Sequence, residues 1–299
     1  MSLRSPFMFA ALLLSALSLM SLQTHAITID HDAGTLTLDK TPTRVVALAF
    51  SFVDALAVAG VSPVGIADDG DKTRIINSVR TLIGDWQSVG SRYQPSLEAI
   101  AALKPDLIIA DSGRHQSIYR ELSQIAPTLM LASRGITYHE NLAVLQRIAL
   151  ALDKTAQVKA RLKKHQQLMR ALKSQFNNND TYQFAIITDK GMWLHSPNSY
   201  AGSVIKELGL SSPLAKNTAE AYLQSSFEQL LKTNPDWLLV GQYTEKTVLD
   251  KWQTSPLWKM LSVAKSKQLI HVPANLWSLT SGMLAAEQMA QALADYARP

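Results

Sequence analysis

The sequence contains no cysteine in its 299 residues. Disulfide bonds, thiolate metal ligands and a cysteine nucleophile are therefore excluded together. A lipid anchor at the start of the mature chain is excluded as well, because it requires a cysteine at the cleavage point. Since 47% of the residues are hydrophobic, the chain can form the cores of two domains of ordinary size without such cross-links.

The sequence also lacks the common enzyme motifs. It contains no G-x-S-x-G nucleophile elbow, no G-x-x-x-x-G-K-[ST] phosphate loop and no H-E-x-x-H zinc motif. A secreted α/β hydrolase or a metalloenzyme stays open as an alternative, but no set of acid, base and nucleophile supports it. The scattered histidines predict neither a cofactor nor a metal site made by the protein alone, and we expect a protein that is not an enzyme.

Long apolar runs are absent except at the start of the chain. Residues 7–22 are apolar apart from serines, Arg4 precedes them, and Thr24-His25-Ala26 has the small-x-small pattern of a cleavage site. This arrangement predicts a signal peptide over residues 1–26 and a free periplasmic protein that begins at Ile27. A membrane anchor is the alternative, but the run is shorter than the ~20 residues that span a bilayer.

The charge of the chain is modest. The formal net charge of +5 becomes +4 when the leader, whose one charged residue is Arg4, is removed. Such a charge is compatible with an anionic ligand, but without a dense basic run it does not indicate nucleic acid. We expect a monomer without a nucleic-acid partner.

One stretch of sequence occurs twice. Residues 96–110 read SLEAIAALKPDLIIA and residues 226–240 read SFEQLLKTNPDWLLV, with four identical positions. In each copy a serine can cap a short helix, a glutamate follows at the positive end of the helix dipole, and the residue before proline ends the helix. The apolar run after Pro-Asp is typical of a strand that is buried on both faces of a parallel sheet. The repeat predicts two similar α/β lobes.

Helices and strands alternate along the rest of the chain. This pattern predicts two Rossmann-like α/β lobes with parallel sheets, over residues 27–152 and 178–299. A hairpin is expected at 27–38. The expected strands are 44–49, 63–67, 86–89, 107–110 and 128–132 in the first lobe, and 183–188, 237–240 and 268–272 in the second.

A long helix is expected between the lobes. Thr137 and Glu140 have capping-box spacing, and a second helical pattern follows over residues 155–176, inside a connecting segment 153–177. Such a helix would be ~33 Å long and could join the two lobes. The alternative is an ordinary surface helix of one lobe.

Cationic loops follow three strands of the first lobe. They contain Arg92 with Tyr93, then Ser112 with Arg114 and His115, and then Arg134. Ligands of open parallel sheets bind beyond the carboxyl ends of the strands, and guanidinium groups bind carboxylates in bidentate fashion. The three loops therefore predict a site for a ligand with several carboxylates, although each arginine alone could be a solvated loop residue. His115 could join this site or pack on a neighbour.

The second lobe offers aromatic residues near its predicted strand ends. Trp193, Tyr200, Tyr243 and Trp277 could cap a bulky ligand or could be half-buried packing residues. Histidines 31 and 165 are expected on surface segments. Glu98 and Glu228, in the repeated Ser-x-Glu, are ordinary first-turn charges locally, but their recurrence in both lobes suggests two contacts with a two-fold partner.

The repeated stretch, the leader and the long helix resemble the periplasmic substrate-binding proteins of iron-siderophore and cobalamin ABC importers, over essentially the whole mature chain. Further motifs resemble the iron(III) dicitrate-binding members: GIADD at 65–69, WQSVG at 86–90, IIADS at 108–112 with Arg114 and His115, and PLW at 256–258. In these members we expect an arginine in the last loop that borders the ligand cleft. Here that loop, residues 276–281, contains no arginine.

The resemblance implies a receptor that holds a ferric chelate between two lobes with little closure. Ferric citrate is the expected ligand, with iron as part of the chelate, and haem or another siderophore is the alternative if Tyr93, His115 or His195 binds iron. Arg92, Arg114 and Arg134 would carry most of the positive charge. Glu98 and Glu228 would form salt bridges with arginines of the permease subunits in the inner membrane.

Overall fold

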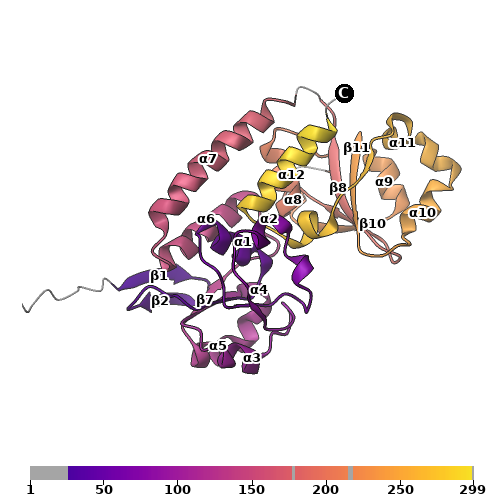
Figure 1. Cartoon of the computed structure of the whole chain (residues 1–299). Coiled ribbons are helices and arrows are strands. Elements are labelled where there is room, and N and C mark those ends of the chain that lie inside the picture. Colours follow the sequence, from indigo (N-terminus) through magenta and orange to yellow (C-terminus); the bar gives the residue numbers. More distant parts are fainter. Residues whose placement is uncertain (1–25, 177–178, 215–217, 298–299) are drawn as a thin grey trace, which may run out of the picture.

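The computed structural model describes residues 26–176, 179–214 and 218–297. It contains two α/β lobes that a long helix joins (Figure 1). The predicted signal peptide lies outside these residues except for Ala26, so its cleavage stays a prediction. Within the described ranges, no helix is long and apolar enough to cross a membrane.

The N-terminal lobe is a parallel five-stranded sheet preceded by the expected hairpin. The hairpin pairs β1 (Ile27–His31) with β2 (Gly34–Leu38), and the sheet has the strand order β5-β4-β3-β6-β7. Its strands are β3 (Val45–Ala47), β4 (Gly65–Ile66), β5 (Gln87–Ser88), β6 (Leu107–Asp111) and β7 (Thr128–Leu131). Its helices are α1 (Phe50–Val58), α2 (Asn77–Arg80), α3 (Leu97–Ala102), α4 (Ser112–His115), α5 (Tyr119–Ile125) and α6 (Tyr138–Ala151), with 3₁₀ turns η1 (Lys72–Arg74) and η2 (Gln116–Ile118).

The apolar strands of this sheet are covered on both faces, as their sequences predicted. Val45 and Ile109 belong to the core that contains α1 and α6, whereas Val46 and Ile108 belong to a separate core with residues of α3 and α5. Successive residues of a strand point to opposite faces, so a continuous apolar run satisfies both cores.

The C-terminal lobe has a mixed sheet in the order β10-β9-β8-β11-β12. The strands β8 (Tyr182–Ile187), β11 (Trp237–Gln242) and β12 (Leu269–His271) are parallel, as expected. Two strands that the sequence did not predict, β9 (Met192–His195) and β10 (Tyr222–Ser225), are antiparallel. The remaining elements are α8 (Tyr200–Glu207), α9 (Phe227–Thr233), α10 (Val248–Gln253), η3 (Pro256–Met260), α11 (Ser262–Ser266), the π-helical turn η4 (Asn275–Leu279) and α12 (Met283–Tyr296).

The long helix α7 (Thr155–Lys173) runs along both lobes (Figure 1) and ends three residues earlier than predicted. Its His165, expected on a surface, is fully buried instead. The ring lies 2.5 Å from the Tyr138 hydroxyl of α6 and 2.8 Å from the Glu287 carboxylate of α12, which also pairs with Arg161 at 2.6 Å. His31 is buried as well, and its Nδ1 accepts the Met130 N–H at 3.1 Å.

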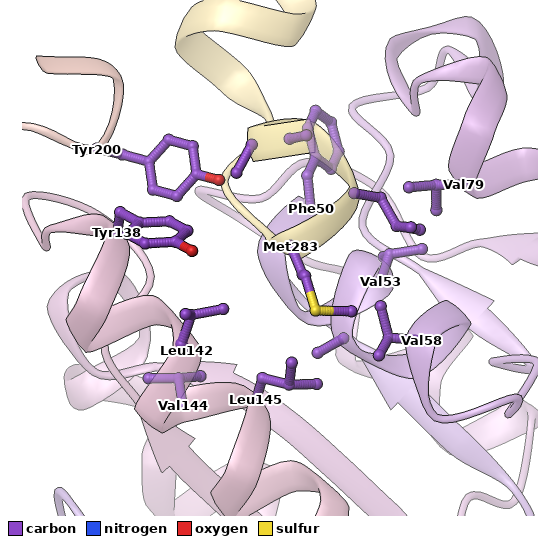
Figure 2. Close-up of a cluster of buried hydrophobic side chains, with 14 of the residues drawn as sticks. Phe50, Val53, Val58, Val79, Tyr138, Leu142, Val144, Leu145, Tyr200 and Met283 are labelled. Carbon is purple, nitrogen blue, oxygen red and sulfur yellow. The ribbon is translucent and has the colours of Figure 1, made fainter. Parts of the chain in front are cut away.

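One hydrophobic core is continuous between the lobes. It combines residues of α1 and α6 with residues of α8 and α12 from the second half of the chain. Figure 2 shows Met283, the first residue of α12, among side chains of α1 and α6 such as Val53 and Leu145. The C-terminal helix therefore packs on the N-terminal lobe and fixes the two lobes to each other.

Candidate ligand-binding site

A cavity of about 290 Å³ is lined by residues of both lobes. The N-terminal lobe contributes Ala49, Phe50, Ser51, Arg92, Tyr93, Arg114, Ser133 and Arg134, and the C-terminal lobe contributes Ile186, Trp193, His195, Tyr222, Ser278, Leu279 and Ser281. The residues from the first lobe follow the carboxyl ends of β3, β5, β6 and β7. This is the edge at which open parallel sheets bind ligands.

A second hollow of about 540 Å³ adjoins the cavity. The two share the side chains of Tyr93, Arg114, Arg134 and Tyr222. The wall of the site therefore extends past the cavity, with two arginines and two tyrosines at the junction.

Arg92 is a buried and fixed cation at one end of the cavity. Its Nε and one Nη contact the Asp69 carboxylate at 2.9 and 2.8 Å, and its guanidinium lies 4.1 Å from the centre of the Phe50 ring. Burial raises the pKa of Asp69, but the hydrogen bonds and charge of Arg92 outweigh burial and hold this pKa below its usual value. Asp69 therefore stays ionised and orients Arg92.

Arg114 is held in a similar way after β6. It contacts the Asp111 carboxylate and donates to the Ser133 hydroxyl, both at 3.1 Å, while the Ser133 hydroxyl also donates to Asp111. Its guanidinium lies 5.0 Å from the centre of the Tyr93 ring. The Nε of Arg114 is buried and has no hydrogen-bond partner among the described residues, so this guanidinium keeps a donor free.

Arg134 differs from the other two arginines. It is exposed and lies 5.0 Å from the centre of the Tyr222 ring. None of the ion pairs found in the described parts of the chain involves Arg134. Within the described residues, Arg92 and Arg114 each pair with a carboxylate and Arg134 pairs with none.

The C-terminal lobe forms an aromatic wall from β9 and β10. Along β9, Met192 and Leu194 point into a core while Trp193 and His195 line the cavity. Tyr222 is the partner of His195 across the two strands, with ring centres 4.8 Å apart. Burial and the charge of Arg134 lower the pKa of His195 to about 3, so its imidazole is neutral at physiological pH.

Five of the nine predicted ligand residues line the cavity: Arg92, Tyr93, Arg114, Arg134 and Trp193. Their contact with ligand stays a prediction. The other four residues are engaged outside the cavity wall. Ser112 donates to Asp32 at 2.7 Å, and the buried His115 accepts the Asp111 N–H at 3.0 Å and contacts the Arg92 carbonyl at 2.9 Å.

The other two are core aromatics. Tyr200 is in the first turn of α8, where its hydroxyl donates to the Gly282 carbonyl. Trp277 is fully buried, with its ring centre 5.3 Å from that of Phe184. Tyr200 was expected near a strand end, but it is the first residue of a helix.

Sequence reasoning missed several cavity residues. The clearest are Phe50, Ser51 and Tyr222, while His195 was considered only as an alternative iron ligand. Ser51 follows a predicted strand, so the rule on strand ends could have found it, and Ser133 belongs to the predicted cationic loop of Arg134. Tyr222 lies on an antiparallel strand that gave no clear signal.

The two repeated glutamates occupy equivalent places. Ser96 caps α3 and Ser226 caps α9, each through its hydroxyl, and Glu98 and Glu228 follow in the first turns. Both glutamates are exposed, and in the described residues neither forms an ion pair within the chain. Each lobe thus presents one free carboxylate on a capped helix.

The comparisons with known proteins agree with this architecture. The sequence profile of the family described as "Periplasmic binding protein" matches residues 45–276. The chain belongs to this family. Across residues 26–176, 179–214 and 218–297, no group of three His, Asp or Glu side chains that could hold a metal ion is found.

Two relatives of this periplasmic binding protein are named for binding ferric citrate. It is 46% identical to the Fe(3+) dicitrate-binding periplasmic protein FecB of Escherichia coli, over 95% of this chain and 93% of FecB. It is 39% identical to the Fe(3+)-citrate-binding protein YfmC of Bacillus subtilis, over 88% of this chain and 83% of YfmC.

Solved structures share the fold. Staphylococcus aureus SirA complexed with staphyloferrin B superposes with a TM-score of 0.79 at 23% identity, over 90% of this chain and 97% of SirA. The petrobactin-binding protein YclQ of Bacillus subtilis also has a TM-score of 0.79 and 23% identity, over 92% of this chain and 100% of YclQ. The prediction of two lobes joined by a long helix is confirmed.

Proposed function

We propose that this protein binds a ferric chelate with several carboxylates, ferric citrate, in the cavity between its lobes. The observation that carries the proposal is the charge pattern of the cavity in a chain 46% identical to FecB. Three arginines line one wall and neutral aromatic side chains line the other. Guanidinium groups favour carboxylates because the two groups form paired, charge-assisted hydrogen bonds.

The three arginines would have two different roles in binding. Arg92 and Arg114 are oriented by Asp69 and Asp111 and can hold a carboxylate in a fixed place, while Arg134 supplies the unbalanced charge that an anionic chelate requires. Trp193 and Tyr222 would cover the chelate from the other lobe. Such a site binds and releases its ligand, and we infer that the protein catalyses no reaction.

The proposed setting is the periplasm, where the protein, as a monomer, would deliver the loaded chelate to an ABC permease. The free carboxylates of Glu98 and Glu228, one on each lobe, would contact arginines of the two permease subunits. The continuous core between the lobes supports docking of both lobes as one unit with little closure.

Haem or another siderophore is the second candidate. It is favoured by the presence of Tyr93 and His195 in the cavity wall, because a neutral imidazole and a phenol can both bind iron. His115 offers no support for it, because both of its ring nitrogens are engaged with the backbone.

Titration of tryptophan fluorescence tests the proposal, because Trp193 lies in the cavity wall. Ferric citrate, iron-free citrate, haem and ferrichrome are added separately to the purified mature protein. Saturable quenching by ferric citrate at the lowest concentration is expected. Quenching by haem alone would replace the citrate assignment with the second candidate, and no response to any ligand would contradict the function as a receptor.

A further inference from the structure

The helices α1 and α12 both begin where the lobes join. They differ in whether a side chain accepts the N–H groups of the first turn. The N-terminus of α12 has a carboxylate: Asp54 of α1 accepts the N–H groups of Leu284 at 3.2 Å and Ala285 at 3.1 Å. The N-cap residue of α1 is Ala49, and no side chain of the described residues caps this helix. A helix start exposes N–H donors and the positive end of the helix dipole, so an uncapped one attracts an anion.

The uncapped start of α1 belongs to the cavity wall. Ala49, Phe50 and Ser51 all line the cavity. The N–H groups of Phe52 and Val53 donate to the Ala49 carbonyl at 3.1 and 3.3 Å, which leaves those of Phe50 and Ser51 without an acceptor inside the helix. The donors nearest to the cavity are therefore the ones that remain available.

Ser51 provides an independent observation. It is only 4% exposed, and its Oγ is buried without a hydrogen-bond partner in the part of the chain that the structure describes. A buried hydroxyl without a partner costs free energy, so such a group in a cavity wall indicates that a ligand supplies the missing partner. Ser51 is itself one of the residues that line the cavity.

A cation lies beside these donors. The Arg92 guanidinium is 4.1 Å from the centre of the ring of Phe50, the first residue of α1. Asp69 occupies its Nε and one Nη, so the other guanidinium N–H groups can donate to an anion at the start of the helix. Backbone donors, a hydroxyl and a guanidinium thus converge on one corner of the cavity.

We propose that the start of α1 is a carboxylate subsite, in which the N–H groups of Phe50 and Ser51 and the Ser51 hydroxyl bind one carboxylate of the ligand beside Arg92. The subsite rests on the proposed function, because it requires a ligand with carboxylates. It is an anchor on the N-terminal lobe in addition to Arg114 and Arg134. Citrate carboxylates and haem propionates share this chemistry, and titrations with each distinguish them.

Two substitutions test the subsite with ferric citrate as the probe. Ser51→Ala removes a hydrogen bond to a charged group, so the Kd is expected to rise about tenfold or more. Ser51→Asp places a negative charge where the ligand carboxylate would bind. Binding is then expected to weaken more than about a hundredfold, because like charges repel across an interface.

Ser78→Ala is the matched control. Within the described ranges the Ser78 hydroxyl is also buried without a partner, but Ser78 lies on α2 and does not line the cavity. Its substitution is expected to change the Kd less than about twofold. The thermal midpoint of each variant is measured in parallel, so that loss of folding is separated from loss of binding.

Each outcome decides one question. Weaker binding in Ser51→Ala but not in Ser78→Ala supports the subsite, and Ser51→Asp binding ferric citrate as tightly as the wild type overturns it. Equal losses in the two alanine variants also overturn it. If Ser51→Asp does not fold, Ser51→Ala decides alone. A wild-type protein that binds none of the probes contradicts the proposed function instead.

Discussion

Asp54 is expected to hold the two lobes together, and its removal should lower stability strongly. The side chain is fully buried and caps the N-terminus of α12 through two backbone N–H groups. Contact is so close at Gly282 that a Cβ there would lie 2.2 Å from the Asp54 Cγ. Asp54→Ala leaves both donors buried without a partner and should lower the free energy of unfolding by about 2 to 4 kcal/mol.

The same carboxyl makes stability depend on pH. Burial raises the pKa of Asp54 from 3.8 to about 7, aided by the charge of Glu287 and opposed by the backbone N–H groups. Because the folded state favours the protonated form, the stabilisation is complete below about pH 4 and is lost as the pH rises through 7. Between pH 5 and pH 8 the loss should be about 2 to 3 kcal/mol.

Urea unfolding followed by circular dichroism at pH 5, 6, 7 and 8 measures this effect. Asp54→Asn is the reference, because its side chain has the same shape and does not ionise. The stability of the wild type relative to Asp54→Asn should fall steadily as the pH rises. A constant difference over this range, or a loss below about 0.5 kcal/mol in Asp54→Ala, would refute the role of Asp54.

Three further predictions concern the cavity, the docking surface and the buried His115. Arg134→Gln should weaken ferric citrate binding about tenfold and reduce its salt dependence, measured by calorimetry at two ionic strengths, because no carboxylate of the described residues pairs with Arg134. Glu98→Lys combined with Glu228→Lys should abolish uptake in cells that depend on the receptor while leaving the Kd unchanged. His115→Ala should lower the free energy of unfolding by about 2 to 4 kcal/mol in urea titrations, because it removes two buried hydrogen bonds.

Each of these has a control and a contradicting result. Arg120→Gln, an exposed arginine of α5 outside the cavity wall, should leave binding unchanged, and an equal effect of the two arginine variants would refute a specific role for Arg134. Loss of ligand binding in the double glutamate variant would indicate a folding defect rather than lost docking. If His115→Ala keeps full stability but loses ligand binding, His115 contacts the ligand and the structural role is wrong.

The parts of the fold that the sequence predicted are those with local signals. The caps at Ser96 and Ser226, the proline after each helix and the apolar strand that follows are all contained in fifteen residues. The strands β9 and β10 were missed because neither has both faces in a core. β9 alternates between a core face and a cavity face that carries Trp193 and His195, and three of the four residues of β10 are not buried. Their antiparallel pairing depends on residues that are distant in sequence.

The sequence predicted the positive charge of the site, but it did not predict which carboxylates of the protein pair with the arginines. Arginines after parallel strands could be placed at one edge of the sheet, and three of them line the cavity. Which arginine a carboxylate neutralises depends on tertiary contacts, such as that of Arg92 with Asp69. Trp277 illustrates the limit, because an aromatic residue after a strand can enter the cavity or, as here, the core.

Native mass spectrometry of the mature protein tests the central claim most directly. The protein is offered ferric citrate, iron-free citrate, haem and ferrichrome together at equal concentration. The arginine-lined cavity predicts one bound species whose added mass contains iron and citrate. A complex with haem or ferrichrome in its place, or the protein without any ligand, would contradict the account.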